Sequence, residues 1–110
     1  MDEYRVRLTL HARQSIVEIS NYIADELLNP SAAIDHVEKF YSEIRKLSDH
    51  PEKYKLIDEQ PWRKEGIRKI RVKNYYIYYW ISEREHVVYV TDVIYAASDQ
   101  SRWLDKMPLN

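Results

Sequence analysis

The chain contains no cysteine and only one glycine among its 110 residues. Without cysteine it has no disulfide, no thiolate nucleophile and no cysteine-ligated zinc, which fits a reducing compartment. A single glycine also excludes the glycine-rich loops that cradle phosphates. The first residues lack the apolar centre of a signal peptide, and no apolar run approaches the roughly 20 residues of a membrane span. We therefore expect a soluble, cytoplasmic protein.

Metal-binding and hydrolase motifs are missing as well. The four histidines are too far apart in the sequence for a His-x-x-x-His or His-Glu-x-x-His pair: His11, His36, His50 and His86. No glycine-flanked nucleophile motif marks a Ser-His-Asp site. The adjacent carboxylates Asp58 and Glu59 fall in a connecting segment, where charged side chains are usually solvated. We expect no metal site and no cofactor.

The composition is typical of one globular domain spanning residues 1–110. Hydrophobic residues make up 45% of the chain and charged residues 32%. This length is sufficient for a single core without disulfides or metals. The net charge of −1 argues against indiscriminate binding to nucleic acid.

The first half of the chain predicts a strand and two helices. Residues 4–10 alternate, with one apolar face formed by Tyr4, Val6, Leu8 and Leu10, and Thr9 can cap the helix that follows. Apolar residues three and four apart then predict two amphipathic helices, the first with Ala12, Ile16, Ile19, Ile23 and Leu27, the second with Ala33, Val37, Phe40, Ile44 and Leu47. Asn29 and Pro30 separate them as N-cap and first helical residue. We expect both apolar stripes to cover a sheet.

The second half predicts that sheet. After a long connection, residues 52–65, come three consecutive β segments and a short final helix carrying Trp103 and Leu104. In the last strand we expect one face formed by Val88, Val90 and Ile94, and the other by Val87, Tyr89, Val93 and Tyr95. The predicted fold is α+β: an N-terminal strand, a helical hairpin, then an antiparallel β-sheet (β-α-α-β-β-β) with a short C-terminal helix.

Residues 66–81 form the stretch around which the chain is organised. Its first half places Lys69, Arg71 and Lys73 on one side of a strand, and on the other Arg68, Ile70 and Val72. Residues 62–73 contain six cationic side chains against one glutamate, a local charge of +5. Such a surface suits an anionic partner, although edge strands are also often protected by lysine and arginine. The second half, from Tyr75 on, is aromatic or β-branched at every position, which predicts an inner strand covered on both sides.

One chemistry that fits these residues is metal-independent cleavage of RNA. It needs a base for the 2′-hydroxyl, cations for the phosphate and an acid for the leaving oxygen. Lys69 and Arg71 are the catalytic cations of this hypothesis, with Tyr95 or Asp99 nearby as the further catalytic group. The remaining phosphate-binding or partner-binding candidates are cationic or aromatic: Arg63, Lys64, Arg68, Lys73, Trp62 and Tyr75.

The order of several short motifs resembles the RelE/ParE superfamily of bacterial type II toxins. These motifs are Leu27-Leu28-Asn29-Pro30-x-Ala32-Ala33, Gly66-Ile-Arg-Lys-Ile, Asn74-Tyr-Tyr-Ile-Tyr-Tyr and Val93-Ile-Tyr95…Asp99-Gln100. The resemblance implies a growth-inhibiting toxin held inactive by an antitoxin whose helix and extended tail wrap the sheet and helical hairpin. RelE-like members cut mRNA in the ribosomal A site, whereas ParE-like members poison DNA gyrase.

The match to the ribonuclease members is incomplete. They tend to carry an arginine where this chain has Tyr76, and another where it has Ala97 and Ser98. Loss of one electrostatic stabiliser typically lowers a rate about a hundredfold or more. We therefore favour a ParE-like toxin that binds a protein target such as gyrase. A ribosome-dependent endoribonuclease and an attenuated member that only binds antitoxin are the alternatives.

Overall fold

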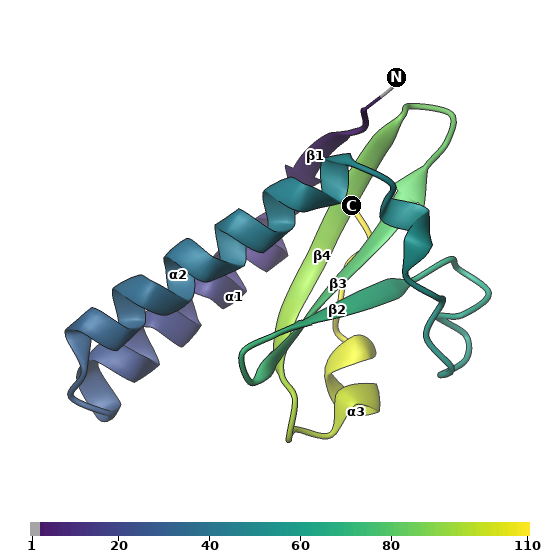
Figure 1. The fold of residues 1–110 in the computed structure, drawn as a ribbon. Helices are drawn as coiled ribbons and strands as arrows, with labels where there is room; N and C mark the ends of the chain where they lie inside the picture. The colour runs from purple at the N-terminus through teal and green to yellow at the C-terminus, as the bar shows by residue number, and fades with distance from the viewer. Residues whose placement is uncertain (1–2) are drawn as a thin grey trace.

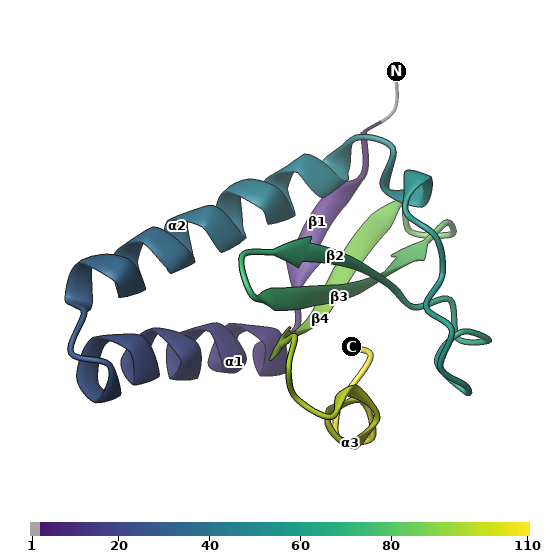
Figure 2. The ribbon, with the colours of Figure 1, turned by 60° about the horizontal axis from the view of Figure 1, so that its bottom comes forward.

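The computed structural model describes residues 3–110 as a helical hairpin packed on one face of a four-stranded sheet (Figure 1). A short C-terminal helix lies on the opposite face (Figure 2). The elements are β1 (Arg5–Leu8), α1 (Leu10–Asn21), a π-helical turn (Tyr22–Glu26), α2 (Pro30–Arg45), two 3₁₀ turns (Lys46–Ser48 and Pro51–Lys53), β2 (Arg68–Val72), β3 (Tyr75–Ser82), β4 (Val87–Tyr95) and α3 (Gln100–Leu104). The predicted α+β order is confirmed.

The strand order in the sheet is β1-β4-β3-β2, so β3 is an inner strand and β2 an edge strand, as expected. The last three strands pair antiparallel in chain order. β1 pairs with β4 in parallel, which the sequence did not predict and which makes the sheet mixed. The helical hairpin returns the chain to the end of the sheet where β1 begins, since the Tyr4 amide donates a hydrogen bond to the Ser48 carbonyl. The chain therefore enters β2 parallel to β1, and after two antiparallel turns β4 runs parallel to β1 as well.

The helix boundaries follow the predicted caps. The Thr9 hydroxyl accepts a hydrogen bond from the Ala12 amide at 3.1 Å, and the Asn29 side chain accepts one from the Ala32 amide at 3.1 Å. Leu10 is therefore the first residue of α1 rather than part of the strand, and it is 70% exposed. A capping side chain satisfies amides that have no partner in the helix, so it fixes where the helix begins.

The hairpin extends past the end of the sheet (Figures 1 and 2). Ala12, Ile16, Phe40 and Ile44 belong to the cluster that packs on the sheet. Ile23 and Ala33 are buried too, but outside that cluster, since the distal halves of the helices pack on each other. The expectation that both stripes cover the sheet therefore holds for the half of each helix next to the sheet and not for the distal half.

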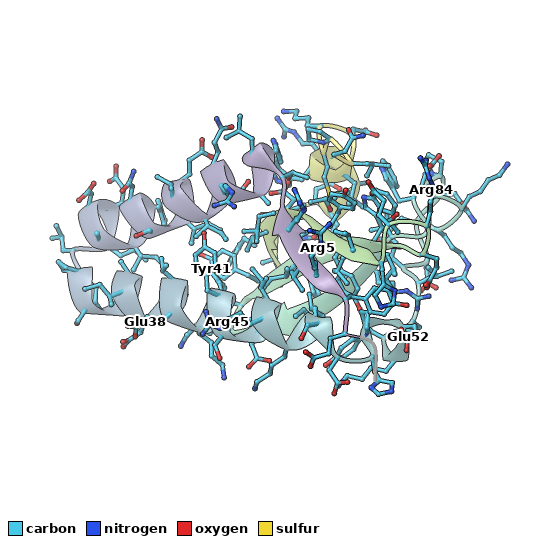
Figure 3. All side chains as sticks on the ribbon, turned by 90° about the horizontal axis from the view of Figure 1, so that it is seen from above. Arg5, Glu38, Tyr41, Arg45, Glu52 and Arg84 are labelled. Atoms are coloured by element: carbon cyan, nitrogen blue, oxygen red, sulfur yellow. The ribbon has the colours of Figure 1, made fainter. Side chains whose placement is uncertain are left out.

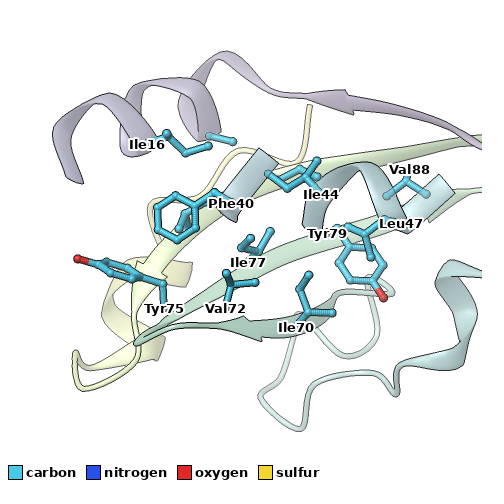
Figure 4. Packing of buried hydrophobic residues seen from close by; sticks show 13 residues of the cluster. Ile16, Phe40, Ile44, Leu47, Ile70, Val72, Tyr75, Ile77, Tyr79 and Val88 are labelled. Carbon is cyan, nitrogen blue, oxygen red and sulfur yellow. The ribbon is translucent and has the colours of Figure 1, made fainter. Parts of the chain in front are cut away.

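Both faces of β3 are covered, as its sequence predicted. On the helical side Tyr75, Ile77 and Tyr79 join Phe40 and the rest of the main cluster (Figure 4). On the other side is a second cluster, consisting of Ile57, Ile67, Tyr78, Ile94, Leu104 and Met107. The connection 52–65 and the C-terminal segment therefore form a third layer over the sheet.

A β-bulge in β4 overturns the predicted faces of that strand. Tyr78 is opposite Asp92 while Tyr79 is opposite Val90, so Thr91 has no residue across from it. One extra residue reverses the alternation beyond it. Val93 therefore lies on the helical side with Val90, and Ile94 lies on the opposite side.

Candidate functional site

Two surfaces of the molecule contain several of the predicted site residues. The first, here called the cationic face, is the side of β2 that points away from the helices, and it consists of Lys69, Arg71 and the neighbouring Tyr76 of β3. The Lys69 ammonium lies 4.1 Å from the centre of the Tyr76 ring, and the Arg71 guanidinium carbon lies 5.7 Å from it. Ile70 and Val72 point the other way, into the core. The predicted outward orientation of the two cations is confirmed.

Lys73 does not join this face. It is the first residue of the two-residue turn between β2 and β3, with a left-handed φ of 53°. Its carbonyl accepts a hydrogen bond from Arg71 Nε at 3.0 Å, which fixes the Arg71 side chain along the strand end. The strand ends one residue earlier than the alternation predicted because the hairpin turns there.

The other predicted cations are dispersed. Arg68 donates hydrogen bonds to the carbonyls of Glu52 and Tyr54, so it anchors the connection 52–65. Arg63 forms an ion pair of 3.6 Å with Asp58. Lys64 is exposed in the same turn region, and Trp62 packs against the second cluster.

The second surface, here called the apolar groove, is a cavity of about 910 Å³ between the helical hairpin, the ends of β3 and β4, and α3. Its lining is largely apolar and aromatic: Ile19, Tyr22, Ile23, Leu27, Tyr75, Val93, Ile94, Tyr95 and Trp103 among others. Sequence reasoning missed this groove, because it depends on how far the hairpin extends beyond the sheet.

Tyr75 and Tyr95 belong to the groove and not to the cationic face. Their ring centres are 5.5 Å apart, and Tyr75 also contacts Phe40 edge-to-face at 5.3 Å. Burial raises the pKa of Tyr75, and the nearby hydroxyls of Tyr95 and Tyr22 raise it further. Tyr75 is only 8% exposed and cannot offer a free ring face to a base. The expectation that Tyr95 stands beside Lys69 and Arg71 is wrong, because the two positions lie on opposite faces of the sheet.

A buried polar network forms one wall of the groove. Asp92, 2% exposed, accepts hydrogen bonds from His11 at 3.0 Å, from the Ser15 hydroxyl at 2.6 Å and from the Val93 amide at 2.8 Å. Asp92 lies just past the end of β1, where the start of α1 takes the place of a strand beside β4. Asp92 was not among the predicted site residues. A carboxylate within an apolar strand was the signal for this network.

The predicted site positions near the C-terminus do not join the cationic face either. Asp99 is the N-cap residue of α3 but makes no capping hydrogen bond with its side chain. Ser98, at a position where an arginine is expected, lines the groove, whereas Tyr76 occupies the other such position on the cationic face. The two expected arginine positions therefore belong to different surfaces.

Within residues 3–110, no three His, Asp or Glu side chains are placed to hold a metal ion together. In the same part of the chain no helix has both the length and the apolar character needed to span a bilayer.

The fold is thus that of a small α+β domain, a helical hairpin on a mixed four-stranded sheet with a cationic edge strand. The family model described as "ParE toxin of type II toxin-antitoxin system, parDE" matches residues 6–100. The chain therefore belongs to the ParE toxin family, and the predicted membership of the RelE/ParE superfamily is confirmed.

Solved structures share this fold at low identity. The chromosomal ParDE toxin–antitoxin system of P. aeruginosa superposes with a TM-score of 0.69 at 11% identity, over 84% of this chain and 96% of that one. The RelBE2 toxin–antitoxin complex of Mycobacterium tuberculosis gives 0.57 at 20%, over 89% and 97%. A mutant of the E. coli toxin RelE in the free state gives 0.57 at 14%, over 92% of each chain.

A curated relative is much longer. Tudor domain-containing protein 7 of Canis lupus familiaris is 24% identical over 102 residues, which is 93% of this chain but 9% of that protein's length.

Proposed function

We propose that this protein is the growth-inhibiting toxin of a bacterial type II toxin–antitoxin system, that it acts in the cytoplasm, and that it binds a protein target such as DNA gyrase. The observation that carries the ParE-like assignment is the division of the catalytic candidates. Lys69 and Arg71 lie on one face of the sheet, and Tyr95 on the other. A ribonuclease must bring base, acid and cations within hydrogen-bond reach of one phosphate. Membership of the ParE toxin family supports the same assignment.

A cognate antitoxin is the proposed first partner. The P. aeruginosa and M. tuberculosis relatives are toxin–antitoxin assemblies. The cationic face points outward and is free of ion pairs among the described contacts, so it suits an acidic segment of the antitoxin. The exposed apolar surface beside the hairpin suits an amphipathic helix.

Supercoiling assays test the target. Purified toxin should inhibit gyrase, and adding the antitoxin should restore supercoiling. A relaxed plasmid that gyrase supercoils normally at a large molar excess of toxin would contradict the gyrase assignment. Induction in cells with and without the antitoxin gene tests toxicity independently of the target.

One observation favours the endoribonuclease alternative. Glu59 and Asp58 line a pocket of about 290 Å³ together with Lys69, so a carboxylate base and a cation share one small cavity. Mapping of transcript ends after induction decides: cuts within codons on ribosome-bound mRNA would support it, and unchanged ends would remove it. If neither assay shows activity, toxicity gained by Ser98→Arg would identify an attenuated toxin.

A further inference from the structure

The end of the sheet nearest the β3–β4 turn carries a second set of cations. Arg5 and Arg7 of β1 are exposed and alternate with Val6 and Leu8, which pack on the main cluster, so both arginines point away from the helices. Arg84 is exposed in the β3–β4 turn, which is hydrogen-bonded to the start of β1 (Figure 3). None of the three arginines forms an ion pair or a side-chain hydrogen bond with another residue of the described range, 3–110.

An aromatic pair continues the row of Arg7 across the sheet. Arg7 is opposite Tyr89 of β4, and Tyr89 is opposite Trp80 of β3. The two rings stack with their centres 5.0 Å apart, and both residues are partly exposed. The Trp80 indole N–H donates to the Leu109 carbonyl at 2.7 Å, so the C-terminal segment borders the pair on the side away from β1. The surface that these residues form is here called the arginine patch: Arg5, Arg7, Arg84, Trp80 and Tyr89.

Two carboxylates of the turn lie beside the arginine patch. Glu85 accepts a hydrogen bond from the Tyr89 hydroxyl at 2.7 Å, and Glu83 accepts one from another tyrosine at 2.8 Å. The Tyr89 hydrogen bond is the main cause that lowers the pKa of Glu85, and the positive charges of Arg84 and Arg7 lower it further. These arginines are therefore within electrostatic range of Glu85 but are not directly paired with it, and the patch keeps an excess of positive charge.

The residue types of the arginine patch are those of a protein-binding surface. Tryptophan, tyrosine and arginine are the side chains enriched where binding energy concentrates in interfaces. Charged residues also protect an edge strand from pairing, but that protection does not require a partly exposed aromatic pair beside them. A strand rises about 3.3 Å per residue, so Arg5 and Arg7 are about 6.6 Å apart along β1. Carboxylates two residues apart in an extended segment have the same spacing.

We propose that the arginine patch binds an acidic, extended segment of the protein that the toxin inhibits. Carboxylates at alternate positions of that segment would pair with Arg5 and Arg7, and a neighbouring apolar side chain would pack on the Tyr89 ring. This inference rests on the proposed function, because it identifies the surface that meets the protein target. The patch shares no residue with the cationic face or the apolar groove, so antitoxin binding does not depend on it.

Other occupants fit less well. A single-stranded nucleic acid offers phosphates to arginine and bases to aromatic rings. It carries a charge at every nucleotide, however, so it would also meet Glu83 and Glu85 with like charge. The patch of a second copy of this chain has the same excess of positive charge and would be repelled.

NMR titration with a model peptide tests the patch without any assumption about the target. The probe is an extended peptide of about 12 residues in which glutamate alternates with threonine, and glutamine replaces glutamate in the control peptide. The glutamate peptide should shift the amide signals of β1 and the β3–β4 turn and the indole signal of Trp80, and the glutamine peptide should not. These shifts should persist in Lys69→Glu, Arg71→Glu and be lost in Arg5→Glu, Arg7→Glu.

Removing the carboxylate of Glu85 refines this titration. Glu85→Gln keeps an acceptor for the Tyr89 hydroxyl and should tighten binding of the glutamate peptide about twofold or more, because one like charge is lost. Shifts that are absent from the patch, or that survive in Arg5→Glu, Arg7→Glu, would overturn the proposal. An oligothymidylate that produces the same shifts at lower concentration would overturn it as well, in favour of a nucleic acid.

Inhibition assays with the full chain test the role of the patch toward the target. Arg5→Glu with Arg7→Glu should raise the concentration for half-inhibition of gyrase about tenfold or more and weaken growth inhibition, with antitoxin affinity unchanged within about twofold. Arg13→Glu with Arg45→Glu makes the same charge change on α1 and α2 and should leave inhibition unchanged. Arg5→Gln with Arg7→Gln, which only removes the charges, replaces the reversal if the reversed protein unfolds early in a thermal scan.

The outcomes separate the two proposals. A wild-type chain that inhibits neither gyrase nor growth would contradict the proposed function, while the peptide titration still decides whether the patch binds acidic segments. A wild-type chain that is toxic, together with an Arg5→Glu, Arg7→Glu variant that is equally toxic, would overturn the role of the patch and leave the proposed function standing.

Discussion

The cationic face lies on the side of β2 away from the helices, whereas the apolar groove lies at the end of the sheet between the hairpin and α3, and the two are built in opposite ways. Lys69 and Arg71 project from the edge strand β2, and the Lys69 ammonium lies over the rings of Tyr76 and Tyr78. The groove is formed by side chains that are also core or network residues, such as Tyr75 and Asp92. The charges of the cationic face can change without disturbing the packing beneath it, whereas most changes in the groove also change stability.

The two surfaces also differ in the exposure of their charged groups. Charges on the cationic face are at least partly exposed, so they steer an acidic partner and respond to salt. Asp92 is removed from solvent and satisfied by three donors, so it acts on the structure around it.

The largest effect is expected for Phe40→Ala, under the groove. Phe40 is fully buried and packs edge-to-face on Tyr75. Removing a buried ring leaves a cavity, and the free energy of unfolding should fall by about 3–5 kcal/mol in chemical denaturation. Ile34→Ala on the same helix removes a 60% exposed side chain and should change it by less than about 1 kcal/mol. On the cationic face, Lys69→Ala should leave it within about 0.5 kcal/mol. A destabilisation by Lys69→Ala comparable to that of Phe40→Ala would show that the cationic face supports the fold as the core does.

The next effect is on binding. Lys69→Glu with Arg71→Glu should weaken antitoxin binding by about a hundredfold, because two like charges then face the acidic segment. The melting temperature should stay unchanged, since both side chains point away from the core. Arg5→Glu with Arg84→Glu makes the same total charge change elsewhere, on β1 and in the β3–β4 turn (Figure 3), and serves as the control. An unfolded Lys69→Glu, Arg71→Glu protein would show that these side chains support the fold.

Much of the fold follows from local patterns in the sequence. The caps at Thr9 and Asn29 and the inner position of β3 were predicted because short-range hydrogen bonding and two-sided apolarity decide them. The bulge at Thr91 was not predicted, because the apolar residues before it, 87–90, and after it, 93–95, fit either face of a covered strand and so do not reveal a break in alternation. The parallel pairing of β1 depends on where the hairpin returns the chain, which is a tertiary property.

The candidate site was predicted in part. The outward orientation of Lys69 and Arg71 follows from alternation with Ile70 and Val72. The position of Tyr95 does not, since it lies beyond the bulge that reverses the face of β4. The groove exists because the hairpin extends past the end of the sheet, and no local sequence pattern determines how far it extends.

A smaller effect should follow Asp92→Asn in the groove wall. An amide keeps the size of the carboxylate but cannot accept from His11, Ser15 and Val93 as a charged group does. We expect the free energy of unfolding to fall by about 1–2 kcal/mol in urea titrations. Asp99→Asn is the matched change at an exposed carboxylate whose side chain does not cap α3, and it should have no measurable effect. Equal stability of the two variants would mean that the network does not hold the groove wall.

The smallest effect separates two tyrosine hydroxyls on opposite sides of the sheet. Tyr79 is buried on the helical side and donates to the Pro51 carbonyl at 2.7 Å, whereas Tyr89 on the open side donates to Glu85 at 2.7 Å. Tyr79→Phe should lower stability by about 1 kcal/mol at neutral pH, and Tyr89→Phe should leave it nearly unchanged.

Measuring the unfolding free energy at alkaline pH extends this test of Tyr79. Burial raises the pKa of Tyr79 above its ordinary value of 10.0, so the folded state retains a proton that the unfolded chain releases. The resulting stabilisation is complete below pH 10.0 and is lost as the pH rises above it. In Tyr79→Phe that group is absent, so the decline of the unfolding free energy above this pH should be shallower than in the wild type. Parallel declines in the two proteins would show that Tyr79 ionises as freely in the folded state as in the unfolded chain, and hence that the helical side of the sheet does not exclude water from its hydroxyl.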